Sequence, residues 1–293
     1  MERYQLKNEE LTLEVVSHGA EMKSLKDNAT GQEYLWCADP AYWGRTSPIL
    51  FPLVGNYRDK KTVYEGKTYG LPQHGFARDM EFELASRTDE EIWFVLTDNE
   101  ETMEKYPFHF RLSLGYRLEG RTVEVLWKVE NTDAKKMYFS IGGHPAFNCP
   151  IREGGKQTEY RLVYDVEGPL TCSMLDANGA IVRETKELPL EQGRMPITEH
   201  LFDGDALVIE HHQAHKVGLA DPQGEVYLEV EFDAPLFGIW SPAGKHAPFV
   251  CIEPWYGRSD RAEFNQKLEE REWGNELEPG EVFERSYRIS CLR

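Results

Sequence analysis

The sequence has few cysteines and no long apolar run. Its five cysteines are scattered through 293 residues, and no Cys-x-x-Cys pair occurs, which argues against a zinc cage or a disulfide framework. No segment approaches the roughly 18 apolar residues of a membrane-spanning helix, and the first residues lack the apolar core of a signal peptide. We therefore expect a cytoplasmic protein with reduced thiols.

Positively charged residues are outnumbered by negatively charged ones. Lysine and arginine number 33 against 51 aspartates and glutamates, for a formal net charge of -18. This balance argues against a nucleic-acid partner and against an anionic membrane surface. It also mildly disfavours an anionic substrate, unless arginines cluster at the site. Neither a Gly-x-Gly-x-x-Gly loop nor a Gly-x-Ser-x-Gly elbow occurs, so we expect no nucleotide cofactor and no serine hydrolase.

Apolar and polar residues alternate with a period of two, as half-buried antiparallel strands require. The alternation is clearest at residues 11–15, 111–118, 123–130, 227–232 and 282–289. Turn-forming residues separate these segments, and helical patterns are limited to residues 98–106 and 262–273. With no break in composition, the sequence predicts one all-β domain over residues 1–293, in which sheet packs on sheet with few short helices.

Three segments break the alternation with polar residues that strands do not need. They contain His74, His144 and Glu253, which we expect at strand ends framed by glycine or proline. Each residue could also have a purely structural role. His74 could cap a loop, His144 could be incidental to a strand-end turn, and Glu253 could be an ion-pair partner. Together, two histidines and a glutamate can move protons on a small polar ligand without a metal or a cofactor. Gly142 and Gly143 would leave room for such a ligand against the backbone.

The histidines of the segment 211-HHQAH-215 suggest a metal site at first sight, because His211 and His215 are four residues apart. The flanking residues 207–209 and 217–219 are typical of strands, however, and would place the histidines in or near a hairpin turn. This context favours a solvated turn, and we expect no metal.

Several motifs, in order, resemble the aldose 1-epimerase (galactose mutarotase-like) superfamily and, within it, the LacX-type branch. The resemblance covers nearly the whole chain and is carried by residues 19–25, 33–36, 43–55, 74–78, 142–147 and 252–255. It implies a large antiparallel β-supersandwich with an open sugar cleft on one face.

The resemblance also implies chemical roles. His144 is expected to protonate the ring oxygen of a pyranose, Glu253 to take the proton of the C1 hydroxyl, and His74 to hydrogen-bond the sugar. The ring then opens, the C1–C2 bond rotates, and reclosure gives the other anomer. Arg45 and Arg78 correspond to arginines that line the cleft in related members.

An aspartate between the middle and last motifs usually binds sugar hydroxyls in this superfamily. Asp203 and Asp205 are both candidates, and Asp205 is favoured because an apolar strand begins directly after it.

One motif departs from the galactose-type pattern. Those enzymes carry His-Gly-Gly, whereas this chain reads 74-HGFAR-78, a version shared with hexose-6-phosphate epimerases. Arg78 with Arg45 could therefore hold a phosphate, although the same arginine could bond a sugar hydroxyl or a cleft carboxylate. The resemblance thus predicts an aldose epimerase acting on a sugar or a sugar phosphate. A non-catalytic sugar-binding or sensing protein is a second possibility; a glycoside hydrolase is disfavoured, because only one of the two required carboxylates is well placed.

Overall fold

Antiparallel sheets make up most of the computed structural model, which describes residues 1–292; 47% of the chain is strand and 6% is helix. This confirms the predicted all-β class. The first three strands form a small sheet of their own, namely β1 (Arg3–Lys7), β2 (Leu11–Val16) and β3 (Met22–Asp27).

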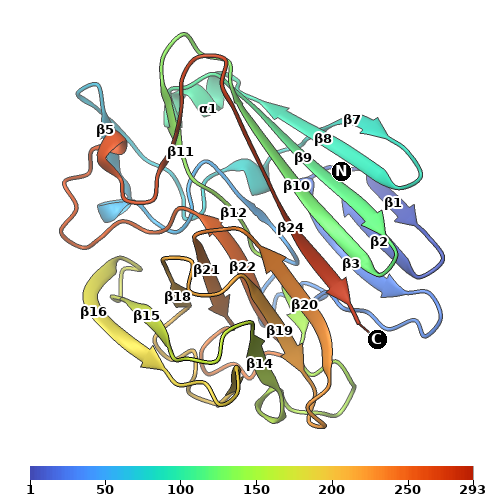
Figure 1. Cartoon of the computed structure of the whole chain (residues 1–293). Coiled ribbons are helices and arrows are strands. Elements are labelled where there is room, and N and C mark those ends of the chain that lie inside the picture. The colour runs from blue at the N-terminus through green and yellow to red at the C-terminus, as the bar shows by residue number, and fades with distance from the viewer. Residues whose placement is uncertain (293) are drawn as a thin grey trace.

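A nine-stranded sheet forms one large layer (Figure 1). In spatial order its strands are β17 (Arg194–Pro196), β14 (Arg161–Tyr164), β19 (Lys216–Ala220), β20 (Val226–Phe232), β24 (Val282–Cys291), β10 (Thr122–Asn131), β9 (Phe110–Glu119), β8 (Glu91–Thr97) and β7 (Glu83–Arg87).

An eight-stranded sheet forms the second large layer. Its order is β16 (Ile181–Leu188), β15 (Leu170–Leu175), β18 (Leu207–Ile209), β21 (Leu236–Trp240), β22 (Phe249–Tyr256), β12 (Ile141–Gly143) and β4 (Ile49–Leu50), with β13 (Ala146–Asn148) also paired to β22. Two short ladders complete the strands: β11 (Met137–Phe139) with β23 (Asn275–Leu277), and β5 (Thr62–Tyr64) with β6 (Lys67–Tyr69).

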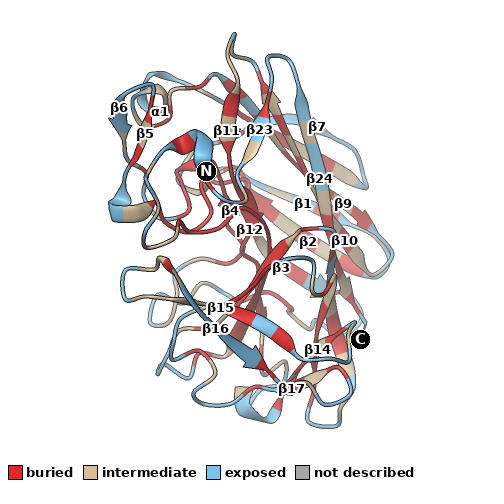
Figure 2. Cartoon of the chain, turned by 60° about the vertical axis from the view of Figure 1, so that its left-hand side comes forward, coloured by how far each residue is buried: buried red, intermediate tan, exposed pale blue. Residues whose placement is uncertain are grey.

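The alternation in the sequence becomes alternation in burial. In β10, every second residue is buried, and the strand pairs with β9 on one side and β24 on the other. The strands at the ends of the two large sheets differ from this pattern: β7 is exposed along its whole length and β16 along most of it (Figure 2). The five segments predicted as strands all lie in strands of the structure, namely β2, β9, β10, β20 and β24.

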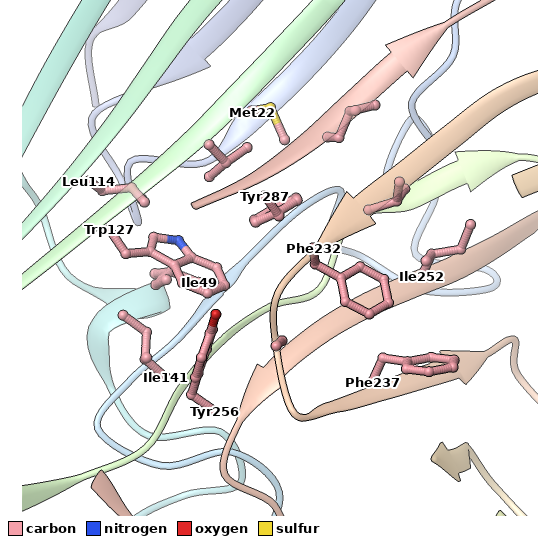
Figure 3. Packing of buried hydrophobic residues seen from close by; sticks show 14 of the residues in the cluster. Met22, Ile49, Leu114, Trp127, Ile141, Phe232, Phe237, Ile252, Tyr256 and Tyr287 are labelled. Carbon is pink, nitrogen blue, oxygen red and sulfur yellow. The ribbon is translucent and has the colours of Figure 1, made fainter. Parts of the chain in front are cut away.

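The two large sheets share one hydrophobic core. Trp127 of β10 meets the ring of Tyr256 of β22 edge-on, with 6.2 Å between ring centroids, and packs against Tyr287 of β24 at 5.2 Å. Figure 3 shows these rings between the sheets, together with Ile141 and Ile252 of the eight-stranded layer. A shared core is what a single domain requires, and one domain over residues 1–293 stays a prediction.

One of the two predicted helices is present. Helix α1 spans Glu100–Lys105, and the side chain of Asn99 caps it by accepting a 3.0 Å hydrogen bond from the backbone N–H of Thr102. The other short helical turns are single 3₁₀ turns at η1 (Arg58–Lys60), η2 (Ala77–Asp79), η3 (Gln157–Glu159) and η4 (Leu268–Glu270).

The prediction of a helix over residues 262–273 is wrong, because that segment contains only η4. Backbone groups that would bond within a helix bond to other elements instead: the carbonyl of Gln266 accepts from the N–H of Val63 at 2.7 Å. Gln266 and Trp273 also adopt positive φ angles of 70° and 60°, which a helix does not allow. Tertiary contacts therefore override the local helical pattern here.

The hairpin predicted around the 211–215 histidines is also wrong, although the flanking strands exist. β18 pairs with β15 and β21, whereas β19 pairs with β14 and β20 in the other sheet. The histidines therefore lie on a connection between the two large sheets. Among the described residues, no helix has the length and apolar character needed to cross a membrane.

Candidate functional site

A cavity of about 250 Å³ lies on the face of the eight-stranded sheet that points away from the nine-stranded sheet. Side chains alternate along β22, so that Ile252 joins the core between the sheets while Glu253 and Trp255 line the cavity. The strand continues to Tyr256, so Glu253 lies within a buried strand and not at its end. Its neighbours on the same face include Val208 of β18 and Trp240 of β21.

Two glycines shape the cavity floor by making room for Trp255. A Cβ on Gly142 would lie 2.7 Å from the Cδ1 atom of Trp255, and one on Gly238 would lie 2.4 Å from its Cη2 atom. A Cβ on Gly143 would meet the hydroxyl of Tyr287 at 2.8 Å. The expectation that Gly142 and Gly143 leave space for a ligand is therefore wrong: they leave space for packed aromatic side chains.

His144 and Glu253 face each other in the cavity. His144 follows β12 directly, where its N–H donates to the carbonyl of Pro48 at 3.1 Å. Its Nε2 atom lies 3.3 Å from Oε2 of Glu253, and both side chains are buried. Within residues 1–292, neither Nδ1 of His144 nor Oε2 of Glu253 has a hydrogen-bond partner. Unpartnered buried polar atoms are rare, so the pair is open to a ligand.

The surroundings favour the neutral form of both groups. Burial raises the pKa of the Glu253 carboxyl well above its usual range. Burial, followed by the positive charges of Arg78 and Arg45, lowers the pKa of His144 to about 3. Both shifts favour the state in which Glu253 holds the proton and His144 is neutral. Moving that proton to His144 would give the imidazolium and carboxylate without any exchange with solvent.

His74 lies beside this pair in a defined tautomer. Its ring meets that of His144 edge-on at 5.6 Å. The backbone N–H of Gly55 donates to Nδ1 of His74 at 3.1 Å, and the N–H of His74 donates to the carbonyl of Gly55 at 2.8 Å. Since Nδ1 accepts, the proton of a neutral ring is on Nε2. Burial, together with His144, Arg78 and Arg45, holds the pKa of His74 well below 6.5, so this histidine is a neutral donor.

The backbone around His74 is fixed tightly. His74 and Gly75 have positive φ angles of 67° and 73°, and a Cβ on Gly75 would lie 2.2 Å from the carbonyl oxygen of Phe51. Only glycine fits that position. The segment is a loop between β6 and η2, whereas the sequence interpretation treated it as a strand end.

Arg45 and Arg78 lie beside the cavity but are not among its lining residues. Arg45 Nη2 donates to Oδ1 of Asp79 at 2.8 Å, and Arg78 Nη2 donates to the carbonyl of Gln73 at 2.7 Å. Nε of Arg78 is buried and has no hydrogen-bond partner in the described part of the chain, although it lies 3.8 Å from Oδ2 of Asp79. Burial and the charge of Arg45 lower the pKa of Arg78 to about 10, so it remains a cation at neutral pH.

The structure separates the two candidate aspartates. Asp205 lines the cavity, and its charge contributes to raising the pKa of Glu253. Asp203 instead accepts a hydrogen bond from Nδ1 of His200 at 2.9 Å on the surface. Of the six residues expected at the site, His74, His144, Glu253 and Asp205 thus line one cavity, and the two arginines flank it.

Two further residues at the site were assigned no role from the sequence. The ring of Trp43 stacks on His144, with 4.7 Å between centroids and 26° between planes. Arg258 lines the cavity, but its guanidinium is already bound by Glu210 at 3.0 Å and by Glu272. Trp43 begins the motif at residues 43–55, which also contains Arg45. This position is the one signal in the sequence that could have pointed to Trp43.

Comparison with known proteins identifies the family. The sequence profile described as aldose 1-epimerase matches residues 2–290. Protein LacX (chromosomal) of Lactococcus lactis subsp. lactis is 33% identical over 297 residues, covering 98% of this chain and 99% of that protein. A putative glucose-6-phosphate 1-epimerase of Escherichia coli K12 is 29% identical over 160 residues, 46% of this chain and 51% of that one.

A solved structure of a related protein has the same fold. The galactose mutarotase related enzyme of Lactobacillus acidophilus superposes with a TM-score of 0.94 at 34% identity, covering 99% of this chain and 97% of that one. The predicted β-supersandwich is confirmed, and the family supports anomer interconversion as the reaction class. The chain belongs to the aldose 1-epimerase family.

Proposed function

We propose that the protein interconverts the α and β anomers of a hexose by acid–base opening and reclosure of the pyranose ring, with His144 and Glu253 as the catalytic pair. The observation that carries the proposal is the 3.3 Å separation of His144 Nε2 and Glu253 Oε2 in a buried cavity. The two reacting oxygens of a pyranose, O1 and O5, are bonded to the same carbon, so the acid and the base must lie close together.

Each proton has a source and a destination. In the charge-separated pair, the Glu253 carboxylate takes the proton of the C1 hydroxyl while the His144 imidazolium protonates O5, and the C1–O5 bond breaks. The sugar is then an open-chain aldehyde, and both side chains are neutral. After rotation about C1–C2, Glu253 returns its proton to O1, His144 removes the O5 proton, and C1–O5 forms again.

The cavity favours one stage of this cycle. Burial favours the neutral pair, which is the state that accompanies the open-chain sugar. His74 donates from Nε2, and we assign it to O5 or a neighbouring hydroxyl. Asp205 accepts from sugar hydroxyls at the cavity wall. A volume of about 250 Å³ is slightly below the roughly 300–1,000 Å³ of sites for larger ligands and suits a monosaccharide.

The direct test is anomer-exchange NMR of pure α-glucose and α-galactose with the purified protein. Glu253→Gln preserves the shape of the side chain and removes the base, so the rate should fall about 10²- to 10⁴-fold. Glu231→Gln, an exposed position on β20, is the matched control and should keep the wild-type rate. Full activity in Glu253→Gln would refute the mechanism, and saturable sugar binding with no rate effect would favour a sugar-binding protein.

A 6-phosphorylated hexose is the second candidate substrate, because Nε of Arg78 has no hydrogen-bond partner among the described residues and lies near a second cation, Arg45. Guanidinium groups bind phosphate bidentately. If this holds, glucose 6-phosphate should have a higher kcat/KM than glucose. Arg78→Met should lower the kcat/KM for glucose 6-phosphate far more than that for glucose and so remove the preference. Equal kcat/KM for both sugars in the wild type would exclude the phosphate role.

We place the protein in the cytoplasm. All five cysteines are free thiols, and four of them are buried. This fits a reducing compartment.

A further inference from the structure

A second cluster of ionisable side chains lies away from the sugar cavity, where the connection from β18 to β19 approaches the turn after β20. His212 and His215 belong to the connection, and Asp233 follows the last residue of β20. Each offers one ligand atom, and the three atoms all lie within 4.8 Å of one another. None of the three lines the cavity that contains His144 and Glu253.

The backbone holds the two histidines side by side. His211 and His212 adopt positive φ angles of 69° and 51°, a conformation that residues with a Cβ rarely adopt. Two hydrogen bonds keep the connection against the turn: the N–H of His212 donates to the carbonyl of Pro235 at 3.0 Å, and the N–H of Phe232 donates to that of His215 at 2.9 Å. The rings of His212 and His215 lie 5.3 Å apart as a result.

His215 has the hydrogen bond typical of a metal-ligating histidine. Its Nδ1 lies 3.3 Å from the carbonyl oxygen of Phe232. A carbonyl only accepts, so Nδ1 carries the proton and the lone pair is on Nε2. Metal-ligating histidines almost always donate their other ring N–H in this way, which fixes the tautomer and the orientation of the ring.

We propose that His212, His215 and Asp233 bind a divalent transition metal of the zinc class, with water completing the coordination. Two imidazoles and a carboxylate form a known zinc ligand set. With metal–ligand bonds of about 2.0–2.1 Å, the ligand atoms need to close by only about an ångström from their present separation. His212 and Asp233 are exposed and His215 is half-buried, so the side chains are free to make that adjustment.

The expected consequence is mechanical. The connection joins β18 of one large sheet to β19 of the other, and Asp233 lies on the turn between β20 and β21, which also changes sheet. The metal would therefore crosslink the β18–β19 and β20–β21 connections, each of which joins the two large sheets. A ligand that binds only the folded state raises the unfolding temperature, so zinc should stabilise the protein. This proposal does not depend on the sugar chemistry.

Titration calorimetry and thermal unfolding of the full-length chain with zinc chloride test the proposal. His212→Asn keeps a residue that tolerates positive φ, and His215→Gln and Asp233→Asn remove the other ligands. Each should weaken zinc binding about tenfold or more and reduce the zinc-induced rise in Tm. His211→Asn is the matched control. His211 has a positive φ angle like that of His212, but its ring packs against Trp273, with 5.0 Å between the ring centroids. This variant should bind zinc like the wild type.

Two results would overturn the proposal. One is a wild-type protein that shows neither binding heat nor a shift in Tm with zinc. The other is binding that survives in the His212→Asn/His215→Gln double variant, because the metal would then lie elsewhere. The buried group of His144, Cys251 and Glu253 is the other place where such atoms converge among the described residues, and zinc bound there would inhibit anomer exchange.

Discussion

The indole ring of Trp43 lies nearly parallel to the imidazole ring of His144, 4.7 Å away. Burial and two nearby arginines oppose a positive charge on that imidazole, yet the proposed cycle requires the imidazolium in its ring-opening step. An aromatic face stabilises a cation placed over it by about 0.5–2 kcal/mol. Trp43 therefore offsets part of the cost of protonating His144.

Replacing Trp43 tests this relationship. Trp43→Leu should lower kcat for anomer exchange on the order of tenfold, because the charge-separated pair becomes rarer, and Trp43→Phe should lower it less. Tyr42→Leu is the control, since Tyr42 belongs to the same loop but packs edge-on against Trp36. The kcat values from NMR line-shape analysis decide the matter: equal losses in Trp43→Leu and Tyr42→Leu would point to a general loosening of the loop.

Asp205 and Asp203 should differ in their effect on substrate binding. Asp205 lines the cavity, whereas Asp203 bonds to His200 on the surface. Asp205→Asn keeps a side chain compatible with the φ angle of 75° and should raise KM about tenfold, because a hydrogen bond to a charged group is lost. Asp203→Asn should leave KM unchanged. Steady-state kinetics with the preferred hexose would contradict the assignment if the two effects were reversed.

His144 should make the protein less stable as the medium becomes acidic. Its pKa falls from 6.5 to about 3 on folding, so between these values the unfolded chain binds a proton that the folded protein does not. Stability contributed here is present above pH 6.5 and is lost as the pH falls through this window. Lowering the pH from 7.5 to 4.5 should cost wild type about 2–3 kcal/mol more than His144→Asn. Urea denaturation at both pH values measures the difference, and identical losses in both proteins would contradict the prediction.

Gly238 should tolerate no side chain. A Cβ there would lie 2.4 Å from Trp255, so Gly238→Ala should lower the free energy of unfolding by about 1–3 kcal/mol through overpacking. It should also raise KM, because Trp255 forms part of the cavity floor. Gly168→Ala is the control, with no atom within 4 Å of the added methyl group. If chemical denaturation gave Gly238→Ala the same free energy of unfolding as wild type, Trp255 would be free to move away from the added methyl group.

The strands of this fold were predictable because their signal is local. Alternation at residues such as those of β9 and β10 reports directly which face is buried. The segment 262–273 could not be predicted in this way, because the partner of Gln266 is Val63, about 200 residues away. The glycines beside His144 were misread for the same reason: Gly142 is dictated by Trp255 on a neighbouring strand.

The site itself was predictable as a set of residues but not as an arrangement. The resemblance identified His74, His144 and Glu253, whereas the tautomer of His74 depends on the N–H of Gly55. The choice between Asp203 and Asp205 depended on how the surface loop turns. The role of Trp43 required seeing which ring it covers.

The two faces of β22 limit how this protein could change its length. Ile252 belongs to the core and Glu253 to the cavity, and the strand is hydrogen-bonded to β21, β12 and β13. Inserting or deleting one residue before Glu253 would exchange the two faces, placing a carboxylate between the sheets and an isoleucine against the sugar. The site can therefore diversify by substitution along β22, or by lengthening the loops around it, but not by indels within the strand.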